Sequence, residues 1–198
     1  GIVVDVWKHF PEREGNEEDI ALTVMANEIN GYGMFLNPIF LGKYTDVHLD
    51  YMKENDMMPV ILEGDMECIS QKLDFYGLNF YNGLFDNAEK EKARKAAAQA
   101  GGNYQDRPEY HTEKLVDVLH MLVDLYHVDI PVYITENGIP QEGDGVPMEK
   151  ILDDQERIDY VTGVLKALHQ AMEEGVDVRG YYIWSLMDNF EWAAGFSP

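Results

Sequence analysis

The chain has a single cysteine, few basic residues and no long apolar run. Cys68 is alone among 198 residues, which excludes an internal disulfide and a cysteine-based zinc site. Only 15 lysines and arginines oppose 37 aspartates and glutamates, so the formal net charge is -22. Such a surface repels phosphate backbones and anionic lipid, and we expect neither nucleic-acid nor membrane partners. No membrane span and no signal-peptide pattern is present, which predicts a cytoplasmic protein.

Short β-branched or aromatic runs alternate with segments of helical apolar spacing. This alternation predicts parallel strands joined by crossover helices, an α/β fold in one domain. The strands are expected over residues 2–6, 75–81, 132–135 and 178–185. The helices are expected over residues 17–30, 46–55, 65–72, 111–127 and 153–174. Residues 87–103 have a helix-forming composition but almost no apolar face, and we interpret them as a solvated loop insertion with some helical content.

Polar and aromatic residues follow three of the predicted strands, where ligands bind in parallel α/β folds. They are Asn79 and Tyr81, then Glu136 and Asn137, then Trp184 with Asp188, Asn189, Glu191 and Trp192. Carboxylates and amides can bind vicinal hydroxyls, and an indole can pack on a sugar ring. A carboxylate there could act as a nucleophile or a general base. Each residue alone has a plainer interpretation, as core, helix cap or surface charge, but together they favour a pocket for a neutral polyhydroxylated ligand.

Four segments carry a resemblance to glycoside hydrolase family 1, the β-glucosidase and β-galactosidase family. They are FLNPIFLGKY (35–44), DFYGLNFYNG (74–83), YITENG (133–138) and GYYIWSLMDNFEW (180–192). They resemble the region between the family's fifth and sixth strands and its sixth, seventh and eighth strands. The resemblance implies a TIM-type (β/α)8 barrel. Residues 1–198 would be the C-terminal part of its single catalytic domain, an incomplete half-barrel of about four parallel strands.

The resemblance also implies a reaction: cofactor-free hydrolysis of β-glycosides with retention of configuration. Glu136 matches the carboxylate that forms a glycosyl-enzyme intermediate, and Tyr81 matches the tyrosine that contacts it. The positions that match sugar-binding residues are Asn79, Trp184, Glu191 and Trp192. Glu191 would repel a 6-phosphate, so an unphosphorylated sugar is expected.

Two parts of the family's machinery have no match in this sequence: the sugar-binding Gln and His of its early strands, and its acid/base residue. A retaining glycosidase needs two carboxylates about 5–5.5 Å apart, and the family's acid/base lies in an Asn-Glu-Pro motif that is absent here. Glu28 follows Asn27 but lies within a helical pattern, so we expect a surface glutamate. The isolated chain is therefore predicted to be inactive. Asp188 and Glu191 lack a third ligand at metal-binding spacing, so no metal site is predicted.

Two other functions stay open on the sequence alone: a noncatalytic sugar-binding half-barrel, and a structural unit that completes a barrel with another chain. A four-stranded half-barrel would leave open edges at residues 2–6 and 178–185. Unpaired backbone groups at such edges favour self-association or docking of a partner chain.

Overall fold

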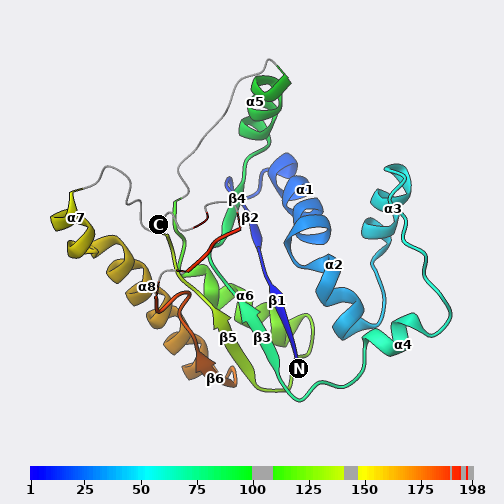
Figure 1. Cartoon of the computed structure of the whole chain (residues 1–198). Coiled ribbons are helices and arrows are strands. Elements are labelled where there is room, and N and C mark those ends of the chain that lie inside the picture. Colours follow the sequence, from blue (N-terminus) through cyan, green and yellow to red (C-terminus); the bar gives the residue numbers. More distant parts are fainter. Residues whose placement is uncertain (100–108, 141–146, 188, 193–194, 196–198) are drawn as a thin grey trace.

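A four-stranded parallel sheet forms the centre of the computed structural model, which describes residues 1–99, 109–140, 147–187, 189–192 and 195 (Figure 1). The strands lie in the order β1-β3-β5-β6, with β1 and β6 at the edges. Their bounds are Ile2–Asp5 (β1), Tyr76–Asn79 (β3), Val132–Glu136 (β5) and Val178–Tyr181 (β6). The predicted half-barrel of about four parallel strands is confirmed, with somewhat shorter strands.

The strand register aligns three polar residues across the sheet. Asp5 of β1 is opposite Asn79 of β3, and Asn79 is opposite Glu136 of β5. An irregularity between Leu78 and Asn79 shifts the register there, so that Asn79 pairs with Glu136 rather than with Thr135. Such irregularities re-aim side chains at strand ends. The carboxyl end of the sheet therefore carries a row of two carboxylates and an amide.

Eight α-helices lie within the described residues. Their bounds are Glu17–Ala26 (α1), Gly33–Leu36 (α2), Asp46–Glu54 (α3), Asp65–Ile69 (α4), Ala88–Gln99 (α5), Lys114–Asp124 (α6), Met148–Asp153 (α7) and Gln155–Glu173 (α8). Asn16 caps α1 by accepting a hydrogen bond from the Asp19 backbone amide at 3.0 Å. The predicted helices are present with shorter bounds, and the predicted helix 17–30 ends at Ala26 because a π-helical turn, Asn27–Gly31, follows.

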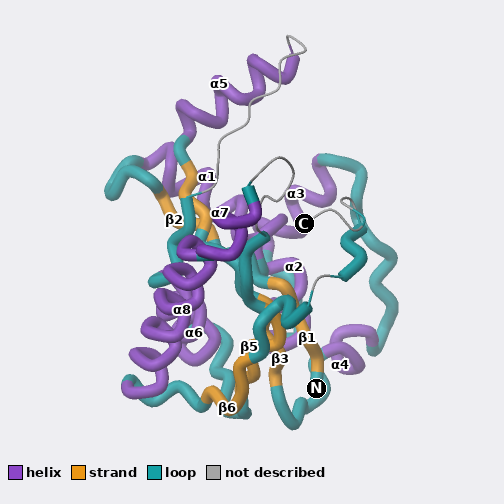
Figure 2. Tube along the Cα trace, turned by 60° about the vertical axis from the view of Figure 1, so that its left-hand side comes forward, coloured by secondary structure: helices purple, strands orange, loops and turns teal. Residues whose placement is uncertain are grey.

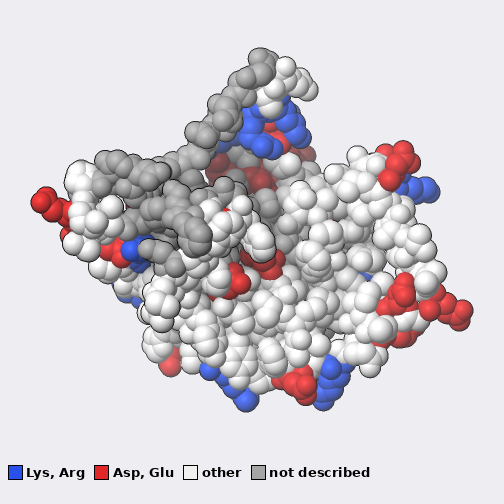
Figure 3. Space-filling model, in the orientation of Figure 1, with Lys and Arg blue, Asp and Glu red and all other residues white. Residues whose placement is uncertain are grey.

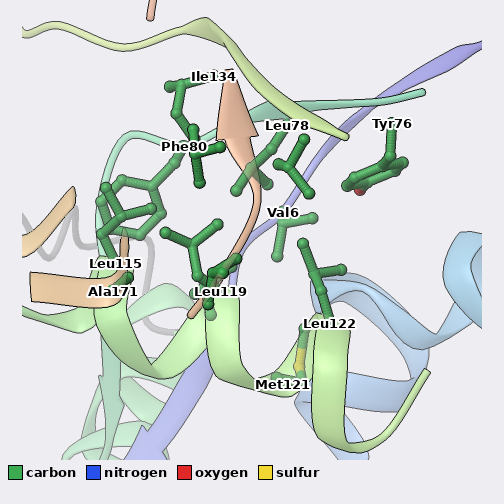
Figure 4. Packing of buried hydrophobic residues seen from close by; sticks show 14 of the residues in the cluster. Val6, Tyr76, Leu78, Phe80, Leu115, Leu119, Met121, Leu122, Ile134 and Ala171 are labelled. Atoms are coloured by element: carbon green, nitrogen blue, oxygen red, sulfur yellow. The ribbon is translucent and has the colours of Figure 1, made fainter. Parts of the chain in front are cut away.

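The hydrophobic core lies between the sheet and helices α6 and α8, which pack side by side (Figure 2). Alternate residues of β3 and its extension, Tyr76, Leu78 and Phe80, are fully buried in the cluster on one face of the sheet (Figure 4). Helix α6 contributes the stripe of Leu115, Val118, Leu119, Met121 and Leu122. Val3 on the opposite face of β1 is 49% exposed, whereas its neighbour Val4 is buried. The sheet is thus covered by helices on one face and open on the other.

Within the predicted insertion, residues 87–103, the helical content is larger than expected: Ala88–Gln99 form the 12-residue helix α5, and 100–103 lie outside the described residues. Its charged side chains form ion pairs within the helix and with neighbouring segments. Glu91 pairs with Arg94 at 2.7 Å within the helix. Pairs to α1 and the segment before it are Arg13–Glu89 (2.6 Å), Lys90–Glu12 (2.9 Å) and Lys92–Glu18 (2.8 Å).

A second, two-stranded parallel sheet, which was not predicted, joins His9–Pro11 (β2) to Leu84–Asp86 (β4). These strands follow β1 and β3, so they extend two parallel neighbours beyond the main sheet.

Most charged side chains on the face shown in Figure 3 lie around its margin, and uncharged residues cover much of the middle. Among the described helices, none has the length and apolarity needed to cross a membrane.

Candidate active site

Glu136 and Tyr81 are joined by a short hydrogen bond at the carboxyl end of the sheet. The Tyr81 hydroxyl donates to Glu136 Oε2 at 2.6 Å, the length typical of a charge-assisted bond to a carboxylate. Burial raises the pKa of Tyr81, and its hydrogen bond to Glu136 raises that pKa further. Tyr81 therefore stays protonated and acts as a fixed donor to the carboxylate.

Backbone contacts between neighbouring strand ends set this pair in place. The Phe80 amide donates to the Glu136 carbonyl at 3.0 Å, and the Tyr182 amide donates to the Ile134 carbonyl at 2.9 Å. The Trp184 amide donates to the Asn137 carbonyl at 2.8 Å. The exits of β3, β5 and β6 are consequently held together just beyond the sheet, which is where the sequence placed the candidate residues.

The structure brings Asn79, Trp184 and Glu191 to the same end of the sheet. Asn79 accepts a hydrogen bond from the Thr135 hydroxyl at 2.7 Å. The Trp184 indole is 44% exposed and donates to Glu191 Oε1 at 3.1 Å. The charges of Asp5 and Glu191 also raise the pKa of Tyr81, so three carboxylates, Glu136 included, act on one hydroxyl. Trp192 is 97% exposed and lies outside this group of contacts.

Asp5 and Trp7 belong to the same surroundings, and sequence reasoning missed both. The Trp7 indole donates to Asp5 Oδ2 at 2.7 Å. Its ring stacks on Tyr81 with centroids 6.1 Å apart and planes 15° apart. Partial burial raises the pKa of Asp5, the Trp7 bond opposes that rise, and the charge of Glu136 adds to it. A signal was available, because the strand IVVD ends in a carboxylate as VYITE does.

Glu28 is a half-buried structural acceptor, so the expectation of a surface glutamate is wrong. Its Oε2 atom accepts hydrogen bonds from Asn37 Nδ2 at 2.9 Å and from the Thr45 hydroxyl at 2.6 Å. Its carbonyl oxygen lies 3.0 Å from His48 Nδ1. These contacts tie the π-helical turn after α1 to the start of α3. In the part of the chain that the structure describes, no three His, Cys, Asp or Glu side chains are grouped to hold a metal ion.

Parallel strands with helices packed on one face and a carboxylate at their carboxyl ends fit part of a (β/α)8-barrel glycoside hydrolase. The family model described as glycosyl hydrolase family 1 matches residues 1–198. The chain belongs to this family.

Two curated relatives are enzymes of Thermotoga. The 1,4-beta-D-glucan glucohydrolase of Thermotoga neapolitana is 35% identical over 193 residues, covering 96% of this chain and 44% of the relative. Beta-glucosidase A of Thermotoga maritima is 35% identical over 195 residues, covering 96% of this chain and 42% of the relative. The chain thus spans less than half the length of these relatives.

Solved structures of β-glucosidases share the fold. The Thermotoga maritima β-glucosidase in complex with glucoimidazole superimposes with a TM-score of 0.74 at 32% identity. That comparison covers 98% of this chain and 43% of the other. A β-glucosidase from Exiguobacterium marinum gives a TM-score of 0.72 at 30% identity, with 98% and 44% covered. This likeness accounts for the four strands as about half of a barrel.

Proposed function

We propose that this chain carries the nucleophile and much of the sugar-binding surface of a retaining β-glycosidase that acts on unphosphorylated β-glycosides. The 2.6 Å contact between the Tyr81 hydroxyl and Glu136 is the observation that carries the proposal. A carboxylate that attacks carbon must be ionised and aimed, and a neutral tyrosine donor favours both conditions. Membership of glycosyl hydrolase family 1 and the β-glucosidase relatives support the same reaction class.

In the proposed step, a Glu136 oxygen attacks the anomeric carbon and forms an ester-like C–O bond. The bond from that carbon to the leaving group breaks, and its electron pair departs with the leaving group. Asn79, Trp184 and Glu191 would bind the sugar through an amide, an indole face and a carboxylate. A 6-phosphate would be repelled by Glu191 and by the charges of Asp5 and Glu136.

The second carboxylate of a retaining pair is supplied by an Asn-Glu-Pro motif in the family, and this sequence lacks that motif. An ordinary alkyl or aryl leaving group needs a proton as it departs. We therefore expect the isolated chain to turn over an aryl β-glucoside negligibly. A 2-fluoro-glucoside with a dinitrophenolate leaving group needs no such proton, so it should still label the nucleophile.

Labelling with 2,4-dinitrophenyl 2-deoxy-2-fluoro-β-glucoside tests the proposal. One fluoroglucosyl group should add to the protein, and peptide mass spectrometry should place it on Glu136. Glu136→Gln should abolish labelling, whereas Glu28→Gln, at another half-buried carboxylate, should leave the labelled position unchanged. Labelling at any other residue would refute the assignment of the nucleophile.

A second candidate function is the completion of a barrel by another chain, and the open sheet favours it. β1 and β6 are edge strands, and Val3 on the uncovered face is 49% exposed. Leu186 and Met187, which follow β6, are 86% and 77% exposed. Exposed strand edges beside apolar side chains are surfaces on which another chain can pair. Sedimentation analysis tests this candidate, because a strictly monomeric protein with no partner would contradict it.

A further inference from the structure

A fully buried amide lies directly behind the proposed nucleophile. Asn137 is 0% exposed and follows Glu136 in the chain. Its Nδ2 group donates to the Phe80 carbonyl at 2.6 Å and to the Tyr160 hydroxyl at 2.8 Å. Its Oδ1 atom accepts from the Tyr181 hydroxyl at 2.8 Å. Both amide hydrogens and one acceptor position of Asn137 are therefore engaged, each with a different segment.

Tyr160 connects this amide to the residue that donates to Glu136. It lies on α8, is 4% exposed, and donates its hydroxyl proton to the Tyr81 carbonyl at 2.6 Å. The same oxygen accepts from Asn137. The Tyr110 ring packs edge-on against the Tyr160 ring with centroids 5.4 Å apart, which limits ring movement. One phenol from outside the sheet thus holds the main chain at Tyr81 and the side chain at Asn137.

We propose that Tyr160 is a positioning residue of the active site, which sets the alignment of the Tyr81 hydroxyl with the Glu136 carboxylate from behind. The inference rests on the function proposed above. Tyr160 acts on both sides of the 2.6 Å contact, through the Tyr81 backbone and through the residue next to Glu136. Because the hydroxyl is buried, water cannot replace it easily, and its loss would leave a carbonyl and an amide hydrogen without partners.

Tyr160→Phe is the decisive substitution because it removes only this hydroxyl. The control is Tyr126→Phe, which removes another buried tyrosine hydroxyl; that hydroxyl donates to Asn37 Oδ1 at 2.8 Å, whereas the Tyr160 hydroxyl makes two hydrogen bonds. Tyr126 contacts the Asn37–Leu41 turn rather than the strand ends, so its loss tests for a general effect of destabilisation. Tyr181→Phe removes only the bond to Asn137 Oδ1, and it should have a smaller effect because the Tyr81 carbonyl keeps its partner.

Two measurements compare these variants with the unchanged protein. The first is the rate of labelling by the activated fluoroglucoside. We expect Tyr160→Phe to slow it about tenfold or more, since small misplacements of reacting groups are costly, while Tyr126→Phe stays within about twofold. The second is the NMR resonance of the Tyr81 hydroxyl proton, identified by its loss in Tyr81→Phe. It should shift or exchange faster in Tyr160→Phe and stay in place in Tyr126→Phe.

The outcomes separate this inference from the function on which it rests. Equal slowing in Tyr160→Phe and Tyr126→Phe, or no slowing in either, would overturn the positioning role. If the unchanged protein is not labelled, the proposed function fails, and the hydroxyl resonance alone decides whether Tyr160 aligns Tyr81 with Glu136. Should circular dichroism show that Tyr160→Phe is unfolded, Tyr181→Phe takes its place, because it loosens Asn137, one of the two residues through which Tyr160 acts. A Tyr81 hydroxyl resonance that changes no more in Tyr181→Phe than in Tyr126→Phe would then overturn the inference.

Discussion

Replacing Gly138 by alanine should destabilise the fold and disturb the site, because its neighbour is a backbone atom. A Cβ atom at Gly138 would lie 2.0 Å from the Trp184 carbonyl oxygen and 3.1 Å from its carbonyl carbon. An ordinary carbon–oxygen contact needs roughly 3.3 Å, so the overlap is about 1.3 Å. A flexible side chain could rotate away, but here the exits of β5 and β6 must separate.

The cost can be worked out from the contacts that such a separation breaks. The 2.8 Å bond from the Trp184 amide to the Asn137 carbonyl joins these two exits and would be lost or stretched. Overpacking and the loss of one hydrogen bond together should cost about 2–4 kcal/mol of unfolding free energy. The Trp184 indole would move with its backbone, and labelling of Glu136 should slow.

Urea unfolding, followed by circular dichroism and tryptophan fluorescence, measures this cost. Gly64→Ala is a suitable control, because Gly64 has φ +89° but no atom within 4 Å of an added Cβ. In that control, the only cost is the strain of placing an alanine in left-handed backbone, which should lower the unfolding free energy by about 1–2 kcal/mol. If Gly138→Ala is no less stable than Gly64→Ala and its folded-state fluorescence is unchanged, the close approach of the two strand exits is refuted.

Two substitutions of carboxylates should change stability with opposite dependence on pH. The pKa of Asp5 is higher in the folded protein than in the unfolded chain, so ionisation of Asp5 lowers stability as pH rises. Asp5→Asn should therefore be more stable than the original protein at pH 7 and nearly equal to it at pH 3. The Arg13 guanidinium lowers the pKa of Asp19, to which it bonds at 2.8 Å. Asp19→Asn should therefore be less stable than the original protein at pH 7, and this difference in unfolding free energy should shrink as pH falls. Urea unfolding at both pH values checks the pair, and deviations of the same sign for both variants would contradict the assigned electrostatics.

Much of the fold could be predicted from the sequence because its signals are local. β-branched runs such as Ile2–Asp5 and the apolar stripe of α6 fix the type of each element through the period of the side chains. Their alternation then requires parallel strands whose carboxyl ends meet. Tyr81 and Glu136 could therefore be expected at one edge of a sheet without any knowledge of their contact.

Contacts between distant segments were decided only by the tertiary structure. Tyr160 and Tyr81 are 79 positions apart, and nothing in an amphipathic helix indicates which buried phenol reaches a carbonyl. The sequence predicts Glu28 as a surface residue, and only the folded structure shows that Asn37 and Thr45 donate hydrogen bonds to its carboxylate. Helix α5, with almost no apolar face, forms ion pairs to α1 and the segment before it, whose partners lie more than 70 positions away.

The chain by itself thus determined the four strands of the main sheet, the helices that alternate with them and the carboxylate that ends VYITE, since the period of the side chains and the ends of strands are set by neighbouring residues. Only the folded structure decided the register of β3 against β5, and with it the alignment of Asp5, Asn79 and Glu136. The same holds for the Asn137–Tyr160 contact. The physical reason is that a hydrogen bond depends on distance and direction to within fractions of an ångström, and only packing of the whole sheet against α6 and α8 sets these.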